Sequence, residues 1–317
     1  MEHIIQVENL VKQYRKAKEP AVRGVTFAVR SGEFFAFLGP NGAGKTTTIS
    51  ILTTTLAKTS GTVTIAGYDL DRQPKQVRRS IGIIFQNPSL DPELTAEENI
   101  RLHVCLYGLY PYRPAYRLMP AEYRKRIADL AEMVGIQGHL FQKLKKFSGG
   151  MKRKLEIIRS LMHRPKVLFL DEPTSGLDAV SRRSLWEYLR QIRDEENTTI
   201  FLTTHYLDEA EGADRVCIIN QGRIEMIGAP HELKQKLISR YMLIDAPDRK
   251  RLGEELREGG WRFIEAGDGF RVFYDSSTPQ DIIAGLKTPL SKLDIYDPSL
   301  EEAYIRLITR EEGGEEA

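Results

Sequence analysis

The sequence predicts an α/β protein built on a largely parallel sheet, followed by a small α+β domain. Three observations carry this prediction. Strand-like and helix-like segments alternate between residues 167 and 220, as they do in parallel sheets covered by helices. A glycine-rich loop separates an apolar run at 34–38 from a helix-like segment that begins at Lys45. Near residue 240 the alternation restarts with a different order of elements.

The first part of the chain predicts an antiparallel β subdomain. Apolar and polar residues alternate around 5–7 and 27–29, which is typical of strands with one buried face. Residues 34–38 are apolar throughout, as in a strand buried on both faces. Between residues 94 and 162 the pattern turns helical, beginning with a capping box at Thr95, so we expect a helical subdomain there.

The remaining elements predict a mixed sheet and then a second domain. Strands and helices are expected to alternate over Val167–Leu170, Ala179–Glu195, Thr199–Thr203, Leu207–Glu211 and Val216–Asn220. After residue 240 the expected order is β-α-β-β-α-β-α, which indicates a split βαβ domain of ferredoxin-like type. With 317 residues in the chain, we expect two domains, at 1–235 and 240–317.

The composition is that of an ordinary soluble globular protein, with 41% hydrophobic and 28% charged residues. The net charge of +2 does not favour a nucleic-acid partner, and the basic run at 143–154 is interpreted as a solvated helix face. Cys105 and Cys217 lack metal-ligand spacing. No signal peptide or bilayer-spanning run is found, so at a membrane another polypeptide would have to hold the protein.

The glycine-rich loop predicts a binding site for ATP and Mg²⁺. It comprises Gly39, Pro40, Asn41, Gly42, Ala43, Gly44, Lys45, Thr46 and Thr47. Glycines let backbone N–H groups turn inward around phosphate, and the following helix N-terminus adds a favourable dipole. Lys45 would neutralise the β- and γ-phosphates, and the Thr46 hydroxyl would bind Mg²⁺.

Two carboxylates predict a hydrolysis site. Asp171 and Glu172 directly follow four apolar residues, at the carboxyl end of a buried strand, where open α/β sheets bind ligands. Asp171 can hold Mg²⁺ through water, and Glu172 can orient or deprotonate the attacking water. The alternative, a pair of helix-capping acids, is less favoured because the chain also contains Lys45 in its phosphate loop.

A second phosphate-binding element lies at Ser148, Gly149 and Gly150. This tripeptide has the form of an N-cap and an exposed helix N-terminus, whose hydroxyl and N–H groups can donate to an anion. One nucleotide needs the loop, the acids and a charge-stabilising donor. Two copies placed head to tail would supply all three at each of two sites.

In this order the motifs resemble one family. Residues 1 to about 235 resemble the nucleotide-binding subunit of an ATP-binding cassette (ABC) transporter. The matching motifs are the loop lysine, Gln86 after a strand, Phe147-Ser148-Gly149-Gly150-Met151, the acidic strand, Ser175-Gly176-Leu177-Asp178 and His205. The usual signature of the family is Leu-Ser-Gly-Gly-Gln. Met151 followed by Lys152-Arg153-Lys154 is similar to the drug-resistance and lipid-exporter branch.

The resemblance implies roles for individual residues. Tyr14 would stack on adenine. Gln86 would bind Mg²⁺, sense the γ-phosphate and touch the membrane partner. Asp178 would link the two sites across a dimer. His205 would contact the γ-phosphate and hold Glu172 and water in line, which makes Glu172, His205 and Gln86 the candidate catalytic residues.

The resemblance also implies a function, the ATPase half of an exporter. Two ATP-binding subunits, with a homodimer favoured over a heterodimer, would act on membrane-spanning permease subunits at the cytoplasmic face of the cell membrane. The direction of transport rests on the resemblance alone, and the substrate is not readable. The segment 107–123, broken by prolines and rich in tyrosines, is expected to be a loop, and 107–116 to face the membrane partner.

Two other classes compete with the transporter. ABC ATPases of DNA repair insert a long coiled coil between the glutamine and the signature, whereas here only 61 residues without sustained heptads separate Gln86 from Ser148. ABC ATPases of translation carry two cassettes per chain, whereas this sequence has one set of the motifs. A regulatory switch would bind nucleotide without turnover. Glu172 argues against the switch.

Overall fold

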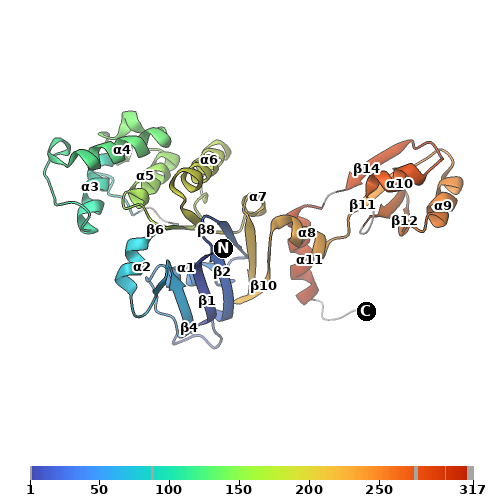
Figure 1. Ribbon diagram of the computed structural model, residues 1–317, viewed down its shortest axis with the longest axis horizontal. Coiled ribbons are helices and arrows are strands. Elements are labelled where there is room, and N and C mark those ends of the chain that lie inside the picture. Colours follow the sequence, from blue (N-terminus) through green and yellow to red (C-terminus); the bar gives the residue numbers. More distant parts are fainter. Residues whose placement is uncertain (1, 87–88, 275–277, 297, 313–317) are drawn as a thin grey trace. The chain divides into compact units, whose positions relative to one another are not determined.

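The computed structural model describes residues 2–86, 89–274, 278–296 and 298–312 (Figure 1). The chain divides into two compact units, Met1–Ile227 and Gly228–Ala317. Of the helices in the described ranges, none combines the length and the apolar character that crossing a membrane requires. All the predicted site residues lie in the first unit.

A four-stranded antiparallel sheet opens the first unit, in the order β2-β1-β4-β5. Its strands are β1 (His3–Lys12), β2 (Val22–Arg30), β4 (Ser60–Ile65) and β5 (Tyr68–Asp69). Ile5 and Val7 of β1 are buried and pair with Val29 and Phe27 of β2. The alternating pattern therefore predicted the buried face of these strands correctly.

The second sheet has six strands in the order β10-β9-β3-β8-β7-β6. They are β3 (Phe34–Leu38), β6 (Ile81–Ile84), β7 (Val167–Asp171), β8 (Thr199–Thr204), β9 (Arg215–Asn220) and β10 (Arg223–Gly228). Strands β9, β3, β8, β7 and β6 run parallel, with Leu38 opposite Thr204 and Asp171 opposite Thr203. The glycine-rich loop, the acidic pair and His205 thus leave the sheet at one edge.

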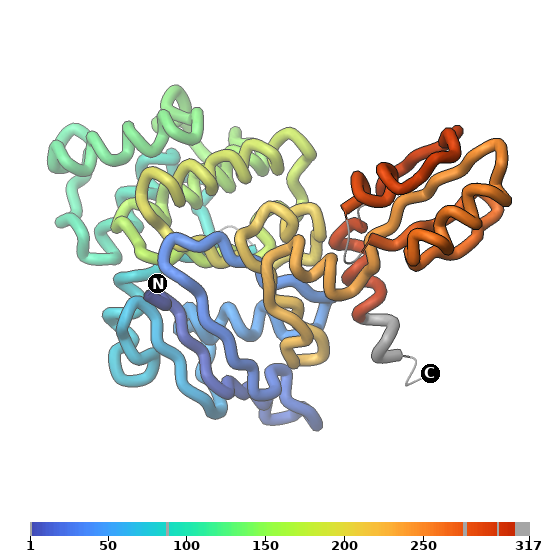
Figure 2. The backbone as a smooth tube through the Cα atoms, turned by 45° about the vertical axis from the view of Figure 1, so that its right-hand side comes forward, coloured from blue at the N-terminus to red at the C-terminus, as the bar shows by residue number. Residues whose placement is uncertain are grey.

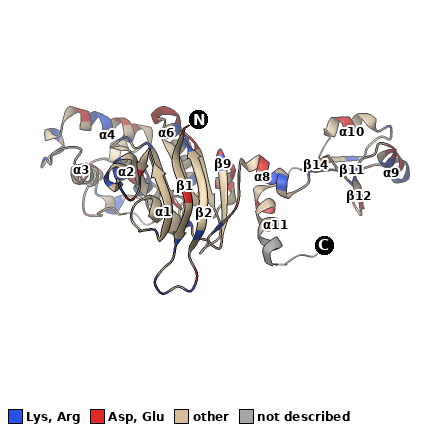
Figure 3. Cartoon of the chain, turned by 60° about the horizontal axis from the view of Figure 1, so that its bottom comes forward, with Lys and Arg blue, Asp and Glu red and all other residues tan. Residues whose placement is uncertain are grey.

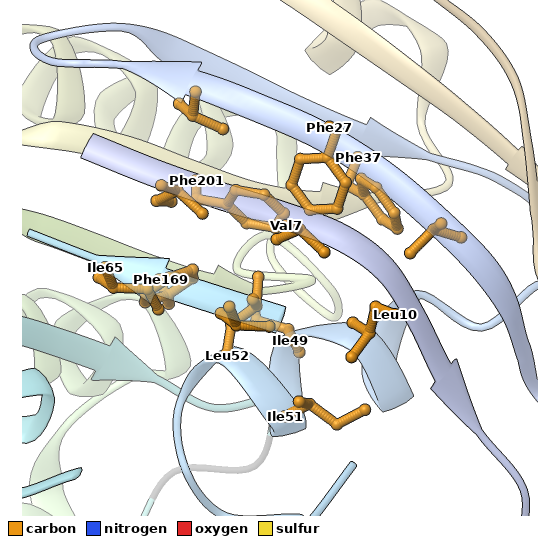
Figure 4. Close-up of a cluster of buried hydrophobic side chains, with 14 of the residues drawn as sticks. Val7, Leu10, Phe27, Phe37, Ile49, Ile51, Leu52, Ile65, Phe169 and Phe201 are labelled. Carbon is orange, nitrogen blue, oxygen red and sulfur yellow. The ribbon is translucent and has the colours of Figure 1, made fainter. Parts of the chain in front are cut away.

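The core of the first unit lies between the two sheets (Figure 4). Phe27 of β2, Phe37 of β3 and Phe169 of β7 surround Phe201 of β8, with ring centroids 5.3–6.1 Å from the Phe201 ring. The first helix after the loop, α1 (Lys45–Leu52), adds Ile49 and other apolar residues to the same cluster. This packing holds the ends of β3 and β7, and with them the site.

The helices of the first unit are α1, α2 (Pro74–Ser80), α3 (Ala96–Leu106), α4 (Ala121–Met133), α5 (Gly149–Leu161), α6 (Ala179–Glu196) and α7 (Leu207–Glu211). Helices α3 and α4 both pack against α5, and this group lies apart from the antiparallel sheet (Figure 2). The predicted capping box at Thr95 is confirmed. The predicted loop at 107–123 is too long, because Pro120 stands at the start of α4, where a proline is tolerated.

The buried imidazole of His103 in this helical group should make the stability of the fold sensitive to acid. Burial, together with the nearby Arg159 and His163, lowers the pKa of His103 to about 3, and its ring lies 4.3 Å from that of Tyr107. Because the unfolded chain binds the proton near pH 6.5, the stability that His103 gives above this pH is lost as the pH falls toward 3. The free energy of unfolding should drop by about 2 kcal/mol between pH 7 and pH 5 from this residue.

Urea titrations at pH 7 and pH 5, followed by Trp186 fluorescence in a Trp261→Phe background, measure this difference. His103→Gln should reduce the drop by about 2 kcal/mol. His3→Gln, which removes an exposed imidazole, should leave it unchanged. An equal drop in wild type and His103→Gln would show that His103 does not carry the effect.

The second unit consists of α8 (Pro230–Leu237), β11 (Tyr241–Asp245), α9 (Arg249–Glu258), β12 (Phe263–Ala266), β13 (Gly269–Phe273), α10 (Pro279–Gly285), β14 (Lys292–Tyr296) and α11 (Leu300–Glu312). Its four strands form an antiparallel sheet in the order β12-β13-β11-β14. Met242, Ile244, Phe270 and Val272 of the central strands pack with residues of α9 and α10. Helix α8, which the sequence pattern did not predict, packs on α11.

Candidate nucleotide site

The glycine-rich loop leaves β3 and turns back into α1. Gly42 and Gly44 have φ angles of 82° and 105°, in the left-handed region that favours glycine. A Cβ on Gly44 would lie 2.6 Å from the carbonyl oxygen of Ala21, so no larger residue fits there. These conformations give the loop its tight curve, and the backbone N–H groups at the start of α1 face the same region.

Lys45 lies at the centre of this loop. Its side chain is 4% exposed, and Nζ donates to the carbonyl oxygens of Gly39 at 2.7 Å and Pro40 at 3.1 Å. Nζ is also 3.6 Å from Oε1 of Glu172. Burial lowers the pKa of Lys45, while the carboxylates of Glu172 and Asp171 act in the opposite direction. The ammonium group thus joins the loop to the acidic pair.

Asp171 is the last residue of β7 and is buried. The hydroxyl of Thr203 on β8 donates to its Oδ1 at 2.6 Å, and the hydroxyl of Thr46 at the start of α1 lies 3.4 Å from the same oxygen. Burial raises the pKa of Asp171, and the hydrogen bond from Thr203 opposes that rise. Asp171 and Thr46, predicted from two motifs 125 residues apart, therefore meet.

Glu172 is the meeting point of the site. Lys45 Nζ lies 3.6 Å and His205 Nδ1 3.3 Å from its Oε1, and the Gln86 amide donates to its Oε2 at 3.2 Å. Its backbone has a φ of 45°, and its N–H lies 3.1 Å from both the carbonyl and the hydroxyl oxygen of Thr203. A non-glycine residue in this conformation costs about 1 kcal/mol or more and marks functional sites in many proteins. Gln86 and His205, the other two predicted catalytic residues, thus both contact Glu172.

Three oxygen groups of this site fit Mg²⁺. They are the Thr46 hydroxyl, the Asp171 carboxylate and the Gln86 side-chain carbonyl, whose amide nitrogen is already used toward Glu172. Mg²⁺ prefers oxygen ligands and keeps several waters, so one carboxylate with neutral oxygens suits it. In the described ranges no group of three or more His, Cys, Asp or Glu side chains is arranged to hold a metal ion, so this mixed set is the candidate.

Tyr14 lies beside the far end of the loop. Its hydroxyl is 3.3 Å from the Thr47 hydroxyl, and Lys12 Nζ is 5.3 Å from the centre of its ring. The side chain is 42% exposed, so one face of the ring is open to a flat ligand. This position next to the phosphate loop is compatible with the predicted contact with a base.

Ser148 is the N-cap of α5, as predicted, and its Oγ accepts a hydrogen bond of 3.2 Å from the N–H of Met151. Ser148 and Gly149 are exposed. A cavity of about 190 Å³ begins at Ser148 and Gly150 and extends between α5 and α6. Within the described ranges, no hydrogen bond or ion pair joins Ser148 to the glycine-rich loop or to Glu172. The two predicted phosphate-binding elements are therefore not joined by such a contact within one chain.

Asp178 is exposed and caps α6. Its carboxylate accepts hydrogen bonds from the N–H of Ser181 at 2.9 Å and from the Ser181 hydroxyl at 2.7 Å. These bonds lower the pKa of Asp178. The carboxylate has a structural role in its own chain, and the predicted contact across a dimer stays a prediction.

Three polar residues of the site were missed in the sequence. Thr203 holds both Asp171 and the backbone of Glu172. Glu209 of α7 is buried and accepts hydrogen bonds from the hydroxyl of Thr174, three residues after β7, and at 2.6 Å from that of Thr204 at the end of β8. Basic and acidic residues are interspersed along the first unit (Figure 3). Arg153 was predicted to belong to a solvated basic helix face, and this is wrong, because its side chain is buried.

The family model and the curated proteins that match this chain all point to ABC transporters or their ATP-binding proteins. A family model described as "ABC transporter" matches residues 22–175. The daunorubicin/doxorubicin resistance ATP-binding protein DrrA of Streptomyces peucetius is 41% identical over 286 residues, 90% of this chain and 81% of that protein. The Nod factor export ATP-binding protein I of Burkholderia orbicola (strain AU 1054) is 34% identical over 310 residues, 97% of each.

A solved structure shares the fold of the first unit. It is a dimeric post-hydrolysis state of the ATP-binding cassette MJ0796 bound to ADP and Pi, 28% identical, with a TM-score of 0.62. The match covers 71% of this chain and 98% of that one. The two export and resistance proteins match over more residues, so their similarity extends into the second unit.

Proposed function

The chain belongs to the ABC transporter family, as an ATP-binding and ATP-hydrolysing subunit of the exporter type, and from this premise we propose the roles of its residues. The loop from Gly39 to Thr47 holds the phosphates, and Lys45 neutralises the β- and γ-phosphates. Tyr14 stacks on the base. The contact of Lys45, Gln86 and His205 with Glu172 is the observation that supports this assignment.

Glu172 is the general base. A water oxygen bonds to the γ-phosphorus as the bond to the β–γ bridging oxygen breaks, and the proton of that water passes to Glu172. His205, 3.3 Å from Oε1, holds the carboxylate in line and contacts the γ-phosphate. Gln86, Thr46 and Asp171 would hold Mg²⁺, which would neutralise charge at the phosphate oxygens. Catalysis of this kind depends mostly on position and charge.

The nucleotide site is completed by a second ATP-binding subunit. Ser148 is exposed, and the N–H groups of Gly149 and Gly150 open a helix, so both can donate to an anion from outside the chain. Because Ser148 and Glu172 are both intact, a homodimer with two active sites is favoured over a heterodimer. Asp178, exposed at the start of α6, is placed to link the two sites. The dimeric relative bound to ADP and Pi supports this arrangement.

The subunit drives permease subunits from the cytoplasmic face of the membrane. The names of the relatives, which specify resistance and export, support export as the direction of transport. The same relatives match most of the chain, which argues against the DNA-repair and translation alternatives.

The two domains are a nucleotide-binding domain, predicted at 1–235, and an accessory or regulatory domain of ferredoxin-like type, predicted at 240–317. The packing of α8 on α11 supports grouping residues 230–237 with the second of these. The antiparallel strand order β12-β13-β11-β14, with one helix after β11 and one after β13, supports this fold assignment.

The segment 107–116, which follows α3, faces the membrane partner. Leu109 and Tyr112 of this segment are 39% and 60% exposed, and Leu106 at the end of α3 is 87% exposed, which is an apolar excess for a surface. Tyr110, by contrast, packs edge-on against the buried Tyr123. In a Cys105→Ser background, Tyr112→Cys bearing a photoreactive maleimide should cross-link to the permease. Ile264→Cys, 57% exposed in the second unit, is the matched control. If Tyr112→Cys gives no more cross-linked permease than the control, this surface is not the partner site.

A further inference from the structure

Polar side chains on the inner side of α5 hold the backbone of β6 and the segment that follows it. The Ser160 hydroxyl donates to the carbonyl of Ile83 at 2.9 Å. The Arg159 guanidinium donates to the carbonyl and the hydroxyl of Ser89 at 2.7 and 2.9 Å. The helix and this segment are therefore joined at several points, far from each other in the sequence.

Among these contacts between α5 and the segment after β6, those of Arg153 include Gln86, a predicted catalytic residue. Its Nη1 donates to the carbonyl oxygen of Phe85 at 2.7 Å, and its Nη2 donates to that of Gln86 at 3.2 Å. The side chain is 4% exposed. One planar guanidinium thus spans two consecutive carbonyls, a geometry that the single ammonium group of lysine cannot reproduce.

A buried carboxylate orients this guanidinium. Glu156, 1% exposed, lies 2.8 Å from Nη1 of Arg153 and 3.9 Å from Nη2 of Arg159. Buried ion pairs add little net stability, because both ions lose their hydration. Net stability is thus a weak reason for this pair, whereas its geometry directs the guanidinium of Arg153 at the carbonyls of Phe85 and Gln86.

In the proposed dimer, Ser148 at the start of α5 serves the site of the partner, whereas Gln86, which Arg153 ties to α5, serves the site of its own chain. Ser148 caps the start of α5, a helix of 13 residues, and is exposed, so it is free to meet the second subunit of the proposed function. The Gln86 amide donates to Glu172 in its own chain. Because a helix moves as a stiff body, a shift of Ser148 is passed along α5 to Arg153 and from there to Gln86.

We propose that Arg153 is a positioning residue that fixes Gln86 to α5, so that Ser148 and the Gln86 side chain are placed together. The inference rests on the proposed function, in which Ser148 meets the nucleotide of the partner and Gln86 meets Glu172. Docking of Ser148 on that nucleotide then sets the contact of Gln86 with Glu172. Closure of the partner's site around its nucleotide thereby places Gln86 against Glu172 in the chain's own site.

A double-mutant cycle on ATP hydrolysis tests the inference in the complex with its membrane subunits. Arg153→Lys should lower kcat about 5- to 50-fold with little change in the KM for ATP, because the coupling acts on catalysis and not on the phosphate loop. Gln86→Ala should also lower kcat. The double variant should be no slower than Gln86→Ala alone, since Arg153 acts through Gln86.

Arg159→Lys is the matched control, because it changes the same residue type in the same helix beside the same Glu156 but holds Ser89. Its kcat should stay within about threefold of wild type, and its effect should multiply with that of Gln86→Ala. If the effects of Arg153→Lys and Gln86→Ala multiply, Arg153 does not act through Gln86. If Gln86→Ala alone hydrolyses ATP at the wild-type rate, the proposed role of Gln86 fails instead. Should Arg153→Lys not fold, Arg153→Gln takes its place in the cycle with the same outcomes.

Discussion

Glu172→Gln should lower the rate of ATP hydrolysis about 10²- to 10⁴-fold, because an amide cannot take the proton of the attacking water. Glutamine has nearly the same shape as glutamate, so the contact with Gln86 can persist. The ion pair with Lys45 is lost, which leaves the ammonium group free for phosphate. The affinity for ATP should therefore be kept while turnover disappears.

Single-turnover hydrolysis and titration with a fluorescent ATP analogue separate these two quantities. Glu187→Gln, an exposed glutamate on α6, is the control and should leave both at wild-type values. If Glu172→Gln hydrolyses ATP as fast as wild type, Glu172 is not the base, and a nucleotide switch without chemistry at this residue becomes the better account.

Ser148→Asp should lower ATP hydrolysis about a hundredfold or more, comparable to the loss of one donor to a developing charge. Aspartate is as good an N-cap as serine, so α5 should remain stable. Its carboxylate would face the γ-phosphate of the partner and repel it. Binding of ATP to the isolated chain should be unchanged, because Lys45 and Glu172 lie in the other half of the site.

Ser148→Asn separates charge from capping, since asparagine caps equally well and adds no charge. It should keep much more activity than Ser148→Asp, with the same melting temperature. Equal losses in both variants would mean that the hydroxyl itself, or the cap, is what the site needs. Full activity of Ser148→Asp would remove Ser148 from the reaction.

Those parts of the fold that depend on local patterns could be predicted from the sequence. The continuous apolar runs of β3 and β7 are typical of buried strands, and the restart after residue 240 has the observed element order. Helix α2 was missed because only Val77 of its residues is buried, so it has no apolar stripe to detect. Pro120 was read as a break although it stands where a helix begins.

The candidate site divides in the same way. Lys45, Thr46, Asp171 and Glu172 follow from the spacing of two short motifs. Gln86 and His205 came from the resemblance, because nothing local to them indicates that they reach Glu172. Arg153 lies in a basic run whose other members are exposed or half-buried, and its partners are 67 and 68 residues away in the sequence. Charge can be counted in a sequence, but burial of one charge depends on the tertiary fold.

Mixing two inactive variants measures most directly whether each pocket is shared between chains. Lys45→Ala removes the phosphate loop of its own chain, and Ser148→Asp removes the donor that the chain lends to its neighbour. In a mixed dimer one pocket carries both changes and the other carries neither. Reassembled at equal amounts with the membrane subunits, the mixture should hydrolyse ATP measurably faster than either variant alone. About a quarter of the wild-type rate is the upper limit, because half the dimers are mixed and each of these has one intact pocket out of two. The coupling through Arg153 lowers the rate below this limit, because the chain that holds the intact pocket carries Ser148→Asp. A mixture as inactive as its two components would contradict the account.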